Sequence, residues 1–214
     1  MKKYFTTLVC LCIAIAINAQ SAEKAKSILD EVTKKTKAYP SIVADFSLAM
    51  ENLQEGISEV YDGSIILKGN KYKVSVMDVV KYFDGTTLYE HMLDAEEVNM
   101  TEPLPDDEEN LNPATIFTIY QEGYKFNYVG DGTADGKACH EIDLFPENRD
   151  KPFSRIKLII FKDNLQLYSM RQVGKDGNSY TVTIKQMTTN KTVDDNTFVF
   201  DQASNPSVDV IDMR

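Results

Sequence analysis

The chain has 214 residues, of which 33 are acidic and 23 are basic, so its formal net charge at pH 7 is −10. Such a surface repels phosphate backbones and anionic lipid surfaces, which argues against nucleic acid as a partner and against direct adsorption to a membrane. The length is typical of one domain with a core of its own.

The N-terminus has the features of a secretory signal. Lys2 and Lys3 form a basic start, residues 8–17 are an apolar run, and Ala19 is a small residue before Gln20. The run is too short to span a bilayer permanently. A buried N-terminal strand and a retained anchor are the alternatives, and the pattern favours a cleaved signal.

Cleavage at this point defines the expected domain organisation. We predict a signal peptide over residues 1–19 and a single exported domain over residues 20–214, located in the periplasm. Cys139 would then be the one cysteine left, so the mature chain forms no intramolecular disulfide. A packed thiol is the expected state of Cys139 because the residue lies in a strand-like segment.

The first element after the signal is a predicted helix. Apolar residues recur at alternating spacings of three and four, which predicts a helix over residues 22–38 that ends before Pro40. The apolar stripe consists of Ala25, Ile28, Leu29 and Val32.

From Ile42 onward the apolar period changes to two, which predicts strands. Turn residues separate the runs, with Asp84-Gly85 as the strongest hairpin signal. We expect eleven or twelve strands in an antiparallel meander, over residues 42–51, 58–68, 71–77, 79–83, 86–91, 95–100, 123–130, 137–145, 153–162, 165–173, 178–189 and 208–212.

One stretch interrupts the strands. Four consecutive acids at residues 106–109 indicate a solvated loop, and Asn112 and Pro113 are a helix cap and a first helical residue. A short helix is therefore expected, which ends at Gly123. Its apolar residues are Ile116, Phe117, Ile119 and Tyr120.

The dimensions of these elements indicate how the sheet is arranged. Eleven strands span about 50 Å at about 4.8 Å per strand, whereas the first helix is about 25 Å long and about 10 Å across. Two short helices cannot cover such a face, so the sheet must curl or close. Its interior is either filled by side chains or left as an apolar cavity. The predicted inward residues are Phe46, Leu48, Tyr72, Val74, Val76, Ile142, Leu144, Ile156, Leu158 and Ile160.

No catalytic or metal-binding pattern is present in the sequence. His91 and His140 lie far apart with no zinc spacing around them, and the nucleophile and phosphate-loop motifs are missing. The acids at residues 106–109 lack the ligand spacing of a calcium loop. We therefore predict a protein that is not an enzyme and that uses no cofactor or metal.

Several segments, in order, resemble one known family. They are AKSILDEV (25–32), ADF (44–46), GSIILKGNKYKVSV (63–76), FDGTTLYEH (83–91), NPATIF (112–117) and SVDVIDMR (207–214). The chain is similar to the periplasmic outer-membrane lipoprotein carrier family, LolA. The resemblance implies an incomplete, curled antiparallel β-barrel of about eleven strands, with two or three short helices as a lid over an apolar cavity.

The resemblance also implies a function and a set of contact residues. Such a protein binds lipoprotein acyl chains and moves them from the inner to the outer membrane, as a monomer that meets an inner-membrane ABC transporter and an outer-membrane acceptor. Phe46 and Leu48 join the expected contact set through strand alternation. The resemblance adds Leu29, Tyr72, Val74, Val76, Ile116, Phe117 and Tyr120.

One position departs from the family. Gly69 stands where the family has an arginine that hydrogen-bonds the lid shut, so the latch is unassigned, with Lys68 and Lys71 as candidates. The alternative functions are a lipid- or lipoprotein-sensing module that binds a protein partner through residues 106–109, and an enzyme acting on lipid.

Overall fold

The computed structural model describes residues 2–103 and 123–214. The predicted acidic loop at residues 106–109 and the predicted second helix at residues 112–121 lie outside the described residues. The same holds for three of the predicted contact residues, which are Ile116, Phe117 and Tyr120.

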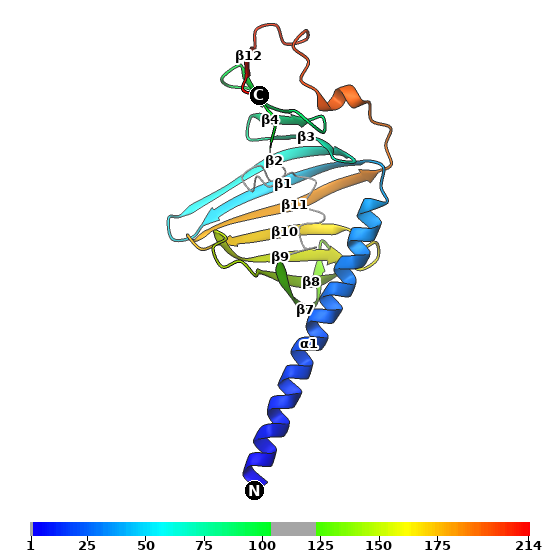
Figure 1. The fold of residues 1–214 in the computed structure, drawn as a ribbon, viewed down its shortest axis with the longest axis vertical. Helices are drawn as coiled ribbons and strands as arrows, with labels where there is room; N and C mark the ends of the chain where they lie inside the picture. Colours follow the sequence, from blue (N-terminus) through cyan, green and yellow to red (C-terminus); the bar gives the residue numbers. More distant parts are fainter. Residues whose placement is uncertain (1, 104–122) are drawn as a thin grey trace.

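The chain begins with one helix, α1 (Lys2–Lys37), where the sequence predicts a signal peptide followed by a separate helix (Figure 1). Its C-terminal end falls where predicted, because the residue before Pro40 disfavours helical geometry. Within the described ranges, no helix is both long enough and apolar enough to cross a membrane. Cleavage after Ala19 remains a prediction.

In the part of the chain that is described, twelve strands form one sheet, and every predicted strand is present with small displacements of its ends. The largest displacement is in β7, which continues past a bulge between Tyr128 and Gly130 because its pairing with β8 extends to Ala134. The strands are β1 (Ile42–Asn52), β2 (Ile57–Lys68), β3 (Lys71–Val76), β4 (Val79–Phe83), β5 (Leu88–Met92), β6 (Glu97–Thr101), β7 (Tyr124–Ala134), β8 (Lys137–Pro146), β9 (Phe153–Phe161), β10 (Leu167–Gly174), β11 (Asn178–Thr189) and β12 (Asp209–Asp212).

The sheet consists of two antiparallel meanders joined by the pairing of β1 with β11. The order is β12-β6-β5-β4-β3-β2-β1-β11-β10-β9-β8-β7, and the end strands β12 and β7 do not pair with each other. The sheet therefore curls without closing, which confirms the predicted incomplete barrel (Figure 1). One pairing differs from the prediction: β12 runs parallel to β6, because the chain first returns across the sheet from β11.

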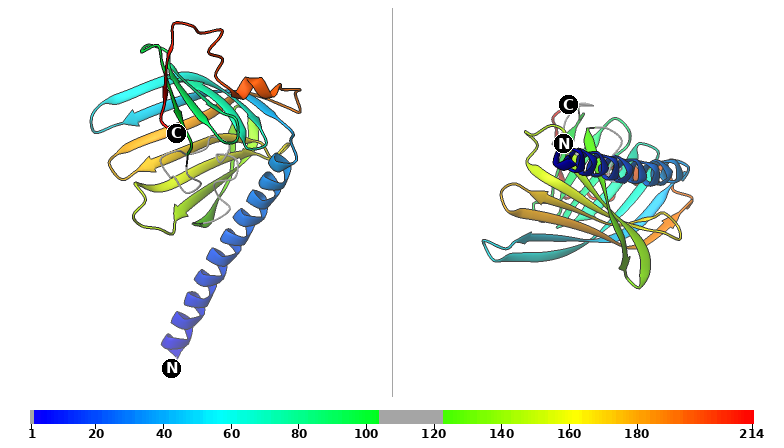
Figure 2. Two further views of the ribbon diagram at one scale, coloured as in Figure 1. Left: turned by 45° about the horizontal axis from the view of Figure 1, so that its top comes forward. Right: turned by 90° about the horizontal axis from the view of Figure 1, so that it is seen from below.

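Helix α1 lies across the concave side of the sheet and contributes to its core (Figure 2). The helix buries Ala25, Leu29 and Val32 there, and burial of a leucine contributes about 2 kcal/mol. The sheet residues buried in the same cluster are Ile42, Ala44, Phe46, Ile65, Leu67, Tyr72, Leu88, Ile142, Leu144, Phe153, Ile156, Leu158, Ile160 and Leu167.

The opposite face carries a second cluster, made by the C-terminal segment that follows β11. Phe200 and Val208 of this segment pack against Val98 of β6. The segment contains a short 3-10 helix, η2 (Asp195–Phe198), which lies against β3 and β4. Phe198 within it is completely buried. No apolar period marks η2 or Phe200, so the sequence does not predict that this part of the segment is ordered.

Candidate functional site

The concave face is the candidate site, and strand alternation explains why it is apolar. Side chains two apart along a strand share a face, and the pairing of β1, β2 and β3 brings Phe46, Gly63 and Val76 into one row. Leu48, Val74 and Val76 keep part of their surface exposed, whereas the other predicted residues of the cluster are buried. The predicted contact residues that the structure describes all join this cluster: Leu29, Phe46, Leu48, Tyr72, Val74 and Val76.

The other half of the sheet adds apolar residues that sequence reasoning missed. Met170 of β10, Val182 and Ile184 of β11, and Phe126 of β7 are partly buried and pack against the same cluster. Alternation with Thr181, Thr183 and Lys185 was the signal that could have found the β11 residues. The concave face thus presents partly exposed apolar groups from both meanders.

Gly63 leaves space for the ring of Phe46. A Cβ atom at Gly63 would lie 2.5 Å from Cζ of Phe46 and 2.8 Å from the backbone oxygen of Ser75. Real side-chain atoms do not approach so closely, so glycine is required for the ring to lie flat across β2.

Tyr72 places a hydroxyl group on this apolar surface. Burial, with a smaller contribution from the charge of Glu90, raises the pKa of Tyr72 to about 12. The phenol is therefore neutral at physiological pH. Its ring lies against Phe83, with 5.3 Å between the ring centroids.

Polar contacts attach helix α1 to β7. The Ser21 hydroxyl accepts a hydrogen bond from the backbone N–H of Tyr128 (3.0 Å) and donates to Oδ1 of Asn127 (3.1 Å). The ammonium group of Lys24 lies 3.7 Å from the centroid of the Tyr128 ring, a cation–π distance. Near the other end of the helix, Lys35 Nζ donates to the backbone oxygen of Asn164 (2.6 Å). These contacts are exposed or half-buried, so each contributes little free energy. The packing of helix α1 on the sheet therefore depends on weak polar contacts as well as on burial of apolar side chains.

A small titratable network lies beneath this junction. The Tyr128 hydroxyl donates to Asp131 and lies 3.1 Å from Nδ1 of His140. Lys162 Nζ is 2.7 Å from the second oxygen of Asp131, and this contact is the main reason that the pKa of Asp131 is lowered. Burial lowers the pKa of His140 and outweighs the opposite effect of Asp131. His140 is therefore neutral at pH 7.

The two histidines give the protein a predicted pH dependence. Burial lowers the pKa of both His91 and His140 below the ordinary value of 6.5, so the unfolded chain takes up protons that the folded chain does not. Their contribution to stability is complete above about pH 6.5 and is lost as the pH falls through the folded pKa values. We expect the unfolding temperature to decrease between about pH 7.5 and 5.5.

The double variant H91Q/H140Q isolates this effect. Its unfolding temperature should depend less on pH over the same interval, as measured by circular dichroism. Asp131 does not interfere, because its lowered pKa places its titration below the ordinary 3.8. An equally steep pH dependence in the double variant would show that other groups cause it.

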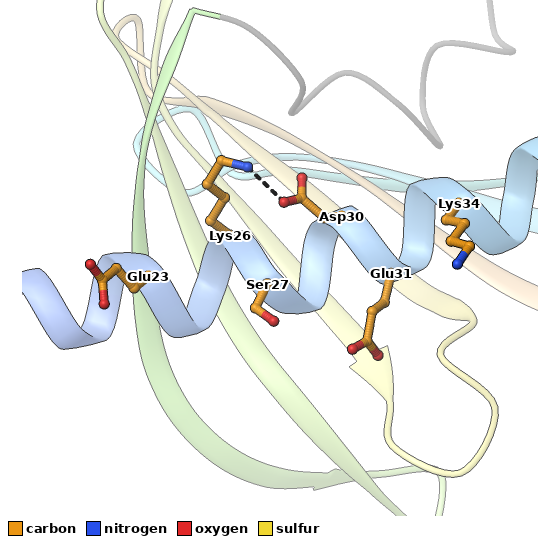
Figure 3. Close-up of a pocket in the computed structure, with 6 residues that line it drawn as sticks. All are labelled: Glu23, Lys26, Ser27, Asp30, Glu31 and Lys34. Atoms are coloured by element: carbon orange, nitrogen blue, oxygen red, sulfur yellow. Dashed lines mark hydrogen bonds and ion pairs between the residues drawn. The ribbon is translucent and has the colours of Figure 1, made fainter.

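A hollow of about 380 Å³ beside helix α1 differs from the concave face in its chemistry (Figure 3). Its described lining comes from one polar face of the helix, where Lys26 Nζ binds Asp30 Oδ2 at 2.6 Å. Charged head groups surround this hollow, whereas the cluster on the concave face is apolar. The lining residues are Glu23, Lys26, Ser27, Asp30, Glu31 and Lys34.

Reactive groups are sparse in the part of the chain that the structure describes. No three His, Cys, Asp or Glu side chains gather there as metal ligands. Cys139 is buried, and burial raises the pKa of its thiol. An inert, packed thiol is the state that the sequence predicts.

A sequence model described as outer membrane lipoprotein carrier protein LolA matches residues 15–160, which is more than half of the chain. The chain belongs to this family. The match extends from the middle of α1 to β9 and so includes the concave residues of the first meander. No curated protein sequence gives a significant match.

Solved structures share the LolA-like fold at low sequence identity. An uncharacterized conserved protein from Thermus thermophilus is 8% identical, with a TM-score of 0.56 over 88% of this chain and 99% of its own. LprF from Mycobacterium bovis is 16% identical, with a TM-score of 0.51 over 81% of this chain and 96% of its own. A putative outer membrane lipoprotein-sorting protein domain from Vibrio parahaemolyticus is 12% identical, with a TM-score of 0.46 over 83% of this chain and 97% of its own. The first two structures, with TM-scores above 0.5, show the fold alone at these identities.

The expected position of the family arginine lies in a turn. Gly69 connects β2 to β3 with a φ of +61°, a conformation that favours glycine, and no atom lies within 4 Å of a Cβ built on it. The candidate latch residues Lys68 and Lys71 both bind Asp195, at 2.6 and 2.8 Å, and lower its pKa to about 2. These lysines therefore hold the C-terminal segment rather than helix α1.

Proposed function

We propose that the protein is a periplasmic carrier that binds the acyl chains of lipoproteins and moves them from the inner to the outer membrane. The supporting observation is the concave face of the unclosed sheet, where Leu48, Val74 and Val76 keep apolar surface exposed. Membership of the lipoprotein carrier family supports the same function. The proposed contact residues are Leu29, Phe46, Leu48, Tyr72, Val74, Val76, Ile116, Phe117 and Tyr120.

The energetics of this surface suit reversible transport. An acyl chain of about 15 methylenes gains about 12 kcal/mol on leaving water, which is more than a carrier needs for retention. Release requires a compensating cost, and displacement of helix α1 from the concave face supplies one, since Leu29 and Val32 are buried there. The polar contacts of Ser21 and Lys24 hold the helix without fixing it permanently.

The proposed carrier acts in the periplasm with two membrane partners. The protein is exported with its signal over residues 1–19, acts as a monomer without catalysis, receives cargo from an inner-membrane ABC transporter and delivers it to an outer-membrane acceptor. The alternative of a sensing module depends on residues 106–109, which lie outside the described residues and stay a prediction.

Identification of the bound cargo tests the function. The mature protein should be purified from periplasmic extract without detergent, and its bound lipids should be identified by native mass spectrometry and organic extraction. We expect acylated species in a fixed ratio to protein, and none on an unrelated exported protein purified in parallel. A wild-type protein that neither carries nor binds acyl chains would contradict the proposal.

A further inference from the structure

An ion pair lies within the apolar concave face. Nζ of Lys81 on β4 is 2.7 Å from Oε1 of Glu90 on β5. Lys81 pairs across the ladder with Val74 of β3, so both charged side chains share the face of Val74. The residues two positions away along the same strands are all apolar: Val79, Phe83, Leu88 and Met92.

This pair contributes little to folding where it lies. The side chains of Lys81 and Glu90 are 35% and 38% exposed, so each has lost most of its contact with water. Partly desolvated pairs recover little more than the cost of removing their charges from water, and apolar residues of similar size stabilise as well or better. A gain in stability therefore does not explain why the pair lies on this face.

The pair retains capacity to bind a ligand. A lysine ammonium carries three N–H donors and a carboxylate has two acceptor oxygens. The described contact between Lys81 Nζ and Glu90 Oε1 uses one donor and one oxygen. Tyr72 lies on the same concave face, and the charge of Glu90 contributes to the raised pKa of its hydroxyl. Together these residues offer donors and acceptors with no net charge.

A neutral site of this kind suits a neutral polar group. Ester and amide carbonyls accept hydrogen bonds from Lys81, and an amide N–H donates to Glu90. A fatty-acid carboxylate or a lipid phosphate would bind Lys81 but meet the negative charge of Glu90 on a chain of net charge −10. Acyl chains that follow such a group then lie against Val74 and its apolar neighbours.

We propose that the Lys81–Glu90 pair binds the uncharged ester and amide groups that join acyl chains to the polypeptide of a lipoprotein. The pair thereby selects lipoproteins over fatty acids and anionic phospholipids. This inference rests on the function proposed above.

Competitive binding tests the selectivity. A neutral fluorescent probe, N-phenyl-1-naphthylamine, reports occupation of the apolar face, and a tripalmitoylated cysteinyl peptide, palmitate and phosphatidylglycerol compete with it. We expect Lys81→Met to weaken lipopeptide binding about tenfold relative to binding of the probe, the value of about one charge-assisted hydrogen bond. Glu90→Gln should strengthen binding of both anions several-fold, because it leaves Lys81 uncompensated.

The charge exchange K81E/E90K is the matched control. It restores a neutral pair, so it should keep the lipopeptide preference that the single variants lose. If all three variants bind the probe and show wild-type selectivity, the pair does not recognise cargo and this inference is wrong. If the wild-type protein binds neither probe nor any acylated competitor, the carrier function itself is overturned, and this inference with it.

Discussion

Replacement of Val76 by aspartate is expected to abolish acyl-chain binding while the sheet stays folded. Val76 lies on the concave face between Gly63 and Val79, and its side chain is only partly buried, so the free protein can hydrate a carboxylate there. A bound acyl chain removes that water. An uncompensated polar group against methylenes costs about 3 kcal/mol or more, which corresponds to at least a hundredfold loss of affinity.

Ser75→Asp is the matched control for this variant. Ser75 is the adjacent residue of β3 and faces the opposite side of the sheet, so the substitution adds the same charge to the same strand. Affinity for an acylated peptide should be measured for both variants, with circular dichroism as the test of folding. Equal losses in the two variants would mean that net charge, rather than the concave surface, determines binding.

Replacement of Phe198 by alanine is expected to reduce the free energy of unfolding by about 3–5 kcal/mol, the usual cost of emptying a buried phenylalanine site. Phe198 has no exposed surface and belongs to η2, which packs against β3 and β4. The lysine contacts of Asp195 keep this segment in place, so the cavity cannot collapse easily.

Val199→Ala serves as the comparison, because Val199 is 37% exposed and follows directly in the chain. Urea unfolding at neutral pH measures both variants, and the Val199 variant should lose less than about 1 kcal/mol. A small loss for Phe198→Ala would indicate that the C-terminal segment detaches without unfolding the sheet.

The positions of the strands could be predicted because alternation is local. Residues such as Phe46 and Leu48, or Tyr72 and Val74, reveal one face of a strand without knowledge of its neighbours. The same alternation predicted that these residues of β1 and β3 lie on one face, and the structure places them in one cluster. The family resemblance then supplied the open barrel, which no local pattern contains.

Long-range pairing could not be predicted from the sequence. The joining of β1 to β11, the parallel addition of β12 and the burial of Phe198 depend on contacts between residues far apart in the chain. The Lys81–Glu90 pair was hidden for a related reason. Each residue looked like an ordinary polar position, and only the register across β3, β4 and β5 places both on the concave face.

The missing bond between β7 and β12 has a mechanical consequence. A closed barrel has its radius set by the number of strands and their stagger, so its capacity is constant. Here β7 and β12 do not pair, so no hydrogen bonds hold the two ends of the sheet together. The two meanders can therefore move apart about the β1–β11 ladder without breaking the hydrogen bonds between paired strands. The width of the concave face is therefore not fixed by closure, and the proposed carrier could hold lipoproteins that have different numbers of acyl chains.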